Sequence, residues 1–292
     1  MYPDLRPRRV TSNESRLLFI VFKTGLVEQG IKQDLYIFID FWQRNVKMNK
    51  KIPKILELYE DYLKSTIKLS NQIMFTLENT KPWESKLGGC PYLEDIEQYP
   101  KGTDGGPMMF LAQINLAEMP PLPEFPHEGL LQFYVENDGC YGWYEGCVVK
   151  HISEYKTDET ALVNENPYSD DYAEDLPFSD NCKITFKQEE IFIGTECPEF
   201  QYKFQNISKK EEKALFELCC ASGSRVGGYP YFVQETPAYY KDSSEYILLL
   251  QLDVDDTSGL MFGDSGNCTF IISRRDLLAG NFTKVHYDWQ CC

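Results

Sequence analysis

The chain repeats itself, and this repeat constrains the architecture more than any other feature of the sequence. Three blocks occur twice in the same order, and the second copies follow the first at offsets of 139, 138 and 137 residues. The paired blocks are 85–93 with 224–232, 110–116 with 248–254, and 129–135 with 266–272. Three matches in one order are difficult to obtain by chance. We therefore predict two related units, unit one at 81–135 and unit two at 224–292.

Each unit has the composition of β structure. A Gly-Gly pair allows backbone conformations that are closed to other residues, and a proline two positions later directs the chain out of the turn. This motif consists of Gly88, Gly89 and Pro91 in unit one and of Gly227, Gly228 and Pro230 in unit two. The apolar runs at 110–116 and 248–254 have the length of strands, and each contains one glutamine.

Four polar residues occupy equivalent positions in the two units, namely Gln113 and Asn115 in the first and Gln251 and Asp253 in the second. A buried amide must satisfy its hydrogen bonds. The four side chains therefore either anchor neighbouring backbone segments or converge on one polar pocket between the units. These two interpretations remain open at the level of sequence.

Asp264 is a fifth candidate for ligand binding. It lies in Gly263–Gly266, a stretch that resembles the nucleophile motif of trypsin-like serine proteases. Catalysis there needs a histidine base, and His127, His151 and His286 all lack the sequence context of that family. A tight turn that leads into the next strand is the simpler interpretation.

Local signals predict the remaining elements. Three helices are expected: one over 53–66, a second that begins at a capping box of Ser208 and Glu211 and ends at a C-cap at Gly223, and a third over 273–279. Strands are expected at 73–77, 147–149, 184–186 and 285–289. Four prolines at 120–126 favour an extended connection within unit one.

The formal net charge of -16 argues against nucleic acid and against an anionic membrane surface as partners. Residues 1–47 carry a net charge of +3, and we interpret them as an N-terminal extension, with a genuine N-terminal subdomain as the alternative. The main domain is then 48–292. Within it, residues 138–199 carry a net charge of -11 and form an acidic insert between the units. This insert is the first surface to test for a partner.

The ten cysteines include no CxxC pair, and no metal site or cofactor is expected. No apolar run approaches the roughly 18 residues that span a bilayer, and no stretch has the pattern of a signal peptide. We therefore expect a cytoplasmic protein with reduced thiols.

Several spaced motifs together resemble the YwqG-like family of bacterial proteins. They are 86–92, 111–115, 129–133, 263–266, 276–277 and the ending 289–292. The resemblance covers residues 48–292. It implies a mainly β (α+β) fold of roll-like architecture, built from two duplicated β units with a few peripheral helices. It carries over no catalytic residues, and members of such families are sometimes encoded beside secreted toxins.

These observations favour a role in protein interaction without catalysis, such as immunity-type neutralisation of a toxin, with a basic protein as the partner. The alternative is a small-ligand-binding protein or an enzyme, with a polar pocket between the two units.

Overall fold

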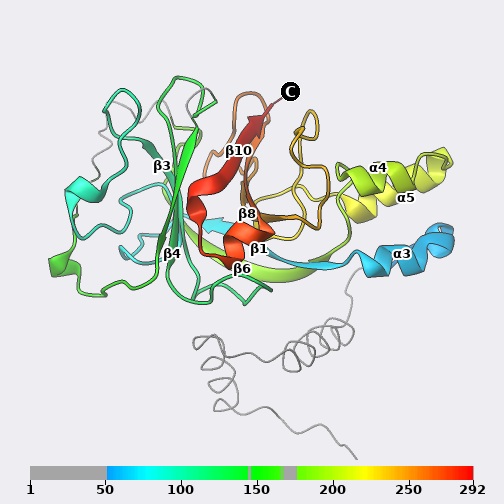
Figure 1. The fold of residues 1–292 in the computed structure, drawn as a ribbon, viewed down its shortest axis with the longest axis horizontal. Coiled ribbons are helices and arrows are strands. Elements are labelled where there is room, and N and C mark those ends of the chain that lie inside the picture. Colours follow the sequence, from blue (N-terminus) through cyan, green and yellow to red (C-terminus); the bar gives the residue numbers. More distant parts are fainter. Residues whose placement is uncertain (1–50, 144–145, 165, 167–175, 292) are drawn as a thin grey trace, which may run out of the picture. The chain divides into compact units, whose positions relative to one another are not determined.

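Figure 1 shows the computed structural model, which describes residues 51–143, 146–164, 166 and 176–291. The predicted extension at 1–47 and the densest part of the acidic insert, at 168–175, lie outside these residues. In the described part, one antiparallel sheet of ten strands dominates the fold. The prediction of a mainly β fold is therefore confirmed.

In chain order the strands are β1 (Lys68–Thr76), β2 (Lys86–Leu87), β3 (Met109–Asn115), β4 (Leu130–Val135), β5 (Cys147–Ile152), β6 (Cys182–Ile191), β7 (Arg225–Gly227), β8 (Tyr246–Leu252), β9 (Asn267–Ser273) and β10 (Val285–Gln290). Their order in the sheet is β10-β9-β8-β7-β1-β6-β2-β3-β4-β5. Both strands within 138–199, β5 and β6, belong to this sheet, and β6 lies at its centre.

The sheet order has an internal two-fold correspondence. Each strand of the first half, β1 to β5, has a counterpart five numbers later in the second half, β6 to β10. If every strand is replaced by its counterpart, the sheet order becomes the same order read from the other end. At the centre, β1 pairs with β7 and β6 pairs with β2, so the first strand of each half completes the sheet of the other half. Equivalent backbone hydrogen bonds are present on the two sides of this centre. The amide of Ile73 donates to the carbonyl of Ser224 over 2.9 Å, and the amide of Ile184 donates to the carbonyl of Ser85 over 3.0 Å.

Corresponding residues also share the core. The register of β3 shifts between Phe110 and Ala112, and that of β8 shifts at the matching place between Leu248 and Leu250. The rings of Phe133 and Phe270, which are equivalent, meet with their centroids 4.9 Å apart. Apolar side chains from both halves therefore form one continuous core.

The two edge strands approach each other, so the sheet is nearly closed like a barrel. Side chains of β10 reach the loop that follows β4: the hydroxyl of Tyr287 donates to the carbonyl of Tyr141 over 2.6 Å, and Trp289 donates from Nε1 to the carbonyl of Cys140 over 2.7 Å. On the other side, the rings of His151 on β5 and Phe282 lie 5.0 Å apart. Each half therefore covers the edge strand of the other.

The helical segments are short and peripheral. The α-helices are α3 (Glu60–Ser65), α4 (Pro198–Lys203), α5 (Lys209–Cys219) and α6 (Arg274–Leu278), and the 3₁₀ helices are η1 (Lys54–Tyr59), η2 (Ile96–Gln98), η3 (Glu159–Ala161) and η5 (Phe282–Lys284). Three of them, α3, α4 and α5, project together from one end of the sheet (Figure 1).

The predicted capping box at Ser208 and Glu211 is present at the start of α5, but the predicted C-cap is wrong. The helix ends earlier, because Cys220 already has an extended backbone, and Gly223 adopts its positive φ three residues further on. The predicted helix over 53–66 is divided into η1 and α3, and Ser273 caps the short helix α6 as expected.

Candidate functional site

Gln113 and Gln251 share one set of hydrogen bonds to backbone in the two halves, and Gln113 also accepts from Nε2 of Gln132 over 3.0 Å. Each side-chain oxygen accepts from a backbone amide, that of Tyr92 over 2.9 Å and that of Tyr231 over 2.8 Å. The Nε2 group of Gln113 donates to the carbonyls of Pro82 and Glu84, and that of Gln251 donates to the equivalent carbonyls of Ala221 and Gly223. Both side chains are fully buried. These contacts bind the Gly-Gly loop of each half to its sheet.

Asn115 and Asp253 are bonded to backbone in the same manner. The backbone amide of each donates to a serine hydroxyl, that of Ser85 in the first half and that of Ser224 in the second. The side chain of Asn115 donates from Nδ2 to the carbonyl of Trp83 and accepts at Oδ1 from the amide of Ala117. The carboxylate of Asp253 accepts from the amides of Gly223 and Val254. The structure thus places the four predicted residues as two separate pairs, one in each half, and their polar groups are used within each half.

Asp264 lies apart from these four, with an exposed side chain. It stands in a tight turn that is closed by reciprocal backbone hydrogen bonds between Phe262 and Gly266. The neighbouring Ser265 has a positive φ of 57° and is also exposed. The geometry of the turn fits a connection into β9.

The first hollow of the structure lies beside the Gly-Gly motif of unit one, and we call it the glycine hollow. Its volume is about 490 Å³. It is lined by Leu77, Glu78, Asn79, Thr80, Leu87, Gly88, Gly89, Asn181 and Cys182. Two of the predicted motif glycines therefore border open space.

The equivalent space in unit two is filled. A Cβ atom on Gly228 would lie 2.5 Å from Cδ1 of Ile191, whereas one on Gly89 would have only Asn181 near it, at 3.9 Å. The register of the central strands makes Thr80 the counterpart of Ile191. Strand β6 continues to Ile191 but β1 stops at Thr76. Thr80 therefore lies beyond the end of its strand, and it lines the hollow instead of filling it.

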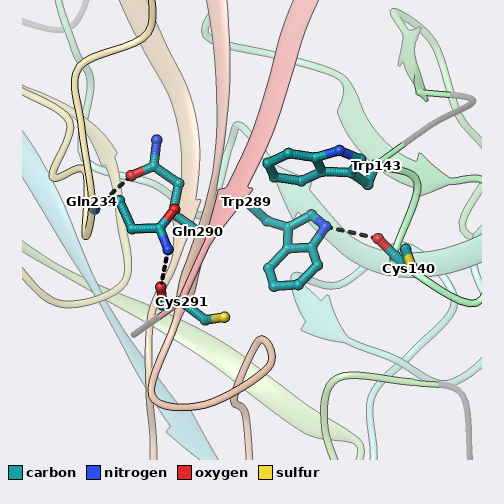
Figure 2. Close-up of a pocket in the computed structure, with 6 residues that line it drawn as sticks. All are labelled: Cys140, Trp143, Gln234, Trp289, Gln290 and Cys291. Carbon is teal, nitrogen blue, oxygen red and sulfur yellow. Dashed lines mark hydrogen bonds between the residues drawn. The ribbon is translucent and has the colours of Figure 1, made fainter.

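The second hollow lies at the end of β10, and we call it the tryptophan hollow. It is lined by Cys140, Trp143, Gln234, Trp289, Gln290 and Cys291, and its volume is about 260 Å³ (Figure 2). The indole of Trp289 is fixed by its bond to Cys140 and by the ring of Tyr141 at 5.3 Å. Trp143 meets Trp289 edge to face, with centroids 5.6 Å apart, and leaves 52% of its own surface exposed.

The opposite side of the tryptophan hollow is polar. The amide of Gln234 donates to Oε1 of Gln290 over 2.7 Å, and Nε2 of Gln234 donates to the carbonyl of Cys291. Gln290 in turn donates to the carboxylate of Asp288 and to the carbonyl of Glu235. These bonds hold a carboxamide opposite the exposed indole (Figure 2).

Sequence reasoning missed the tryptophan hollow. Its residues come from three segments that are far apart in the chain, so no local motif marks it. One signal was available: Trp143 stands in a loop with glycines at 139, 142 and 146, where a large aromatic residue has no strand or helix to pack into.

A buried cation occupies the same position in both halves. Arg225 forms an ion pair with Glu189, over 3.2 Å. Its counterpart Lys86 donates only to the carbonyls of Lys81 and Cys90 among the described residues. Burial lowers the pKa of Lys86 to about 8. We assign Lys86 to the framework, because it holds the loop before the Gly-Gly motif.

In the part of the chain that the structure describes, no group of three or more histidine, cysteine, aspartate or glutamate side chains is placed to hold a metal ion. Among the described residues, the nine cysteines form no disulfide bond with one another. No helix among the same residues has the length and apolar character needed to cross a membrane.

The described part of the chain defines a class: a mainly β protein whose two halves correspond in the sheet, with the glycine hollow beside one half and the tryptophan hollow at the end of β10. Within this class, the chain belongs to the family described as Domain of unknown function (DUF1963), whose sequence model matches residues 85–291. The match begins at the first repeated block and includes strands β2 to β10, but not β1. No curated protein matches the chain.

Proposed function

We propose that this protein binds a basic protein partner without catalysis and that the tryptophan hollow is the anchor of the interface. The exposed indole of Trp143 carries the proposal. Tryptophan is enriched among the residues that dominate binding energy, and a side chain held in place before binding loses little entropy when the partner arrives. The net charge of -16 favours rapid association with a partner of opposite charge.

A location in the cytoplasm and neutralisation of a toxin are the finer form of this proposal. Both rest on the resemblance to the YwqG-like proteins. A protein that neutralises a basic enzyme needs a preformed anchor and complementary charge rather than reactive groups of its own.

The test compares the wild-type chain with Trp143→Ala in binding to a partner that is first captured from cell extract at low salt and then purified. The matched control is Tyr202→Ala, because Tyr202 is an aromatic residue that is 81% exposed on α4, outside the hollow. We expect a basic partner whose Kd rises at least about tenfold in Trp143→Ala, as for the loss of a dominant interface residue. Equal binding by the two variants, or a partner that is itself acidic, contradicts the proposal.

The glycine hollow favours a second candidate function, the binding of a small polar ligand. The observation in its favour is that the equivalent space is filled by Ile191 in unit two but is open and bordered by Asn79, Thr80 and Asn181 in unit one. Its volume falls within the range of ligand pockets. A titration with glucose and glycerol, followed by NMR, should shift the amide signals of Gly88 and Gly89 in the wild type but not in Thr80→Ile. Unchanged signals with both probes exclude this class of ligand.

A further inference from the structure

We infer that the tryptophan hollow receives an arginine side chain of the partner. This inference rests on the proposed function and names the group that the partner presents. It depends on the size of the hollow, on its exposed indole and on one unused hydrogen-bond acceptor.

The size of the hollow indicates a single side chain. Pockets for small molecules and cofactors usually have volumes of roughly 300 to 1,000 Å³. The tryptophan hollow, at about 260 Å³, lies just below that range. Because the hollow is open to solvent, a side chain can enter it while the rest of the partner stays on the surface.

The indoles favour a planar cation. Trp289 cannot turn away, because its Nε1 group is bonded to the carbonyl of Cys140. The two indole planes meet at 77°, so a group that lies against one ring meets the other nearly at a right angle. A guanidinium group stacks on the face of an indole, and tryptophan provides the strongest cation–π contact among the aromatic residues.

The polar side of the hollow supplies an acceptor. Nε2 of Gln234 is engaged with the carbonyl of Cys291, so the orientation of this carboxamide is set. No donor from the described residues bonds its Oε1 atom, and Figure 2 shows this amide across the hollow from Trp143. A guanidinium group carries its donors at the edge of its plane and can stack and donate at once. The ammonium group of lysine has no flat face to stack.

The charge near the hollow attracts a cation without creating a buried ion pair. Glu235 is exposed beside Gln234, and the carboxylate of Asp288 accepts from Gln290 behind the polar side. Neither carboxylate lines the hollow itself. The guanidinium group therefore keeps part of its hydration, and discrimination between cations depends on stacking and on the amide acceptor.

The test uses three capped tripeptides, Gly-Arg-Gly, Gly-Lys-Gly and Gly-citrulline-Gly, titrated into the full chain with ¹⁵N-labelled tryptophan. The indole signals of Trp143 and Trp289 are followed by NMR and are assigned with Trp143→Phe and Trp289→Phe. We expect the arginine peptide to shift the Trp143 signal and to bind at least about threefold more tightly than the lysine peptide, given the size of exposed cation–π contacts. Citrulline, which is planar but neutral, should bind more weakly than arginine.

Two variants locate the effect. Gln234→Ala should reduce the preference for arginine over lysine while the Trp143 signal still shifts, and Tyr202→Ala should change nothing. Equal binding of the arginine and lysine peptides, tighter binding of citrulline, or no shift at Trp143 overturns the inference. The proposed function fails separately: it fails if the purified partner binds Trp143→Ala as well as the wild type, whatever the peptides do.

Discussion

Replacing the buried glutamines tests whether the two halves share one framework. Gln113→Met keeps much of the side-chain volume but removes every polar atom of the carboxamide. It leaves the amide of Tyr92 and the carbonyls of Pro82 and Glu84 without their partner. An unsatisfied buried group costs roughly 1 to 3 kcal/mol. The amide of Tyr92 is buried and the two carbonyls are part-buried, so we expect a loss of about 1 to 3 kcal/mol in the free energy of unfolding.

Gln251→Met should lose a similar amount, because it leaves the equivalent amide of Tyr231 and the carbonyls of Ala221 and Gly223. The control is Gln188→Met, whose amide makes one exposed bond to the carbonyl of Pro121 and should cost less than about 1 kcal/mol. Urea unfolding at constant m-value gives the free energies.

The double variant tests the separation of the two sites. Gln113 and Gln251 share no bonding partner, so their losses should add to within about 0.5 kcal/mol. Losses below about 1 kcal/mol in either single variant would refute the anchoring role. A strong positive or negative coupling would mean that the two side chains meet at a common place.

Two further predictions concern the Gly-Gly motif and the buried lysine. Gly89→Ala and Gly228→Ala both place a side chain at positive φ, which costs roughly 1 to 2 kcal/mol of unfolding free energy. Gly228→Ala should lose more stability than Gly89→Ala, because its Cβ would lie 2.5 Å from Cδ1 of Ile191. Equal losses in urea unfolding would mean that the open space beside Gly89 is absent. Burial lowers the pKa of Lys86 to about 8 from 10.5, so the unfolded chain binds more protons between these values and stability rises with pH there. This penalty is about 3 kcal/mol at pH 7. Lys86→Met should therefore flatten the rise in unfolding free energy from pH 8 to 9.5, to which Lys68 also contributes. An unchanged pH profile would show that folding does not lower the pKa of Lys86.

The sequence predicts those parts of the fold that depend on local chemistry. The capping box of α5, the cap of α6 and the strands around Gln113 and Gln251 are all present, because each depends on neighbouring residues or on short-range periodicity. The central pairing of β1 with β7 and of β6 with β2 could not be predicted. It joins segments more than 90 residues apart, and β2 and β7 contain only two and three residues, which is too short for an alternating pattern.

The candidate sites are harder to predict from the sequence than the fold is. Equivalent polar residues in a repeat suggest a shared role, and here that role is anchoring the loops of both halves. A hollow arises where corresponding residues of the two halves differ, and a comparison based on similar blocks does not detect such positions. Thr80 and Ile191 are counterparts only through the register of β1 and β6, which no alignment of the three repeated blocks includes.

The tryptophan hollow illustrates how a symmetric framework produces a single site. The register of the edge strands makes His151 on β5 the counterpart of Trp289 on β10. Phe282, in the connection between β9 and β10, packs against His151 and covers that position in one half. In the other half, the connection between β4 and β5 contributes Trp143, which stands edge to face with Trp289 and leaves the space beside both rings open. Since both halves use the same strands, the difference between these two connections is sufficient to create a hollow on one side only. A partner that requires this hollow should therefore bind with a stoichiometry of one per chain.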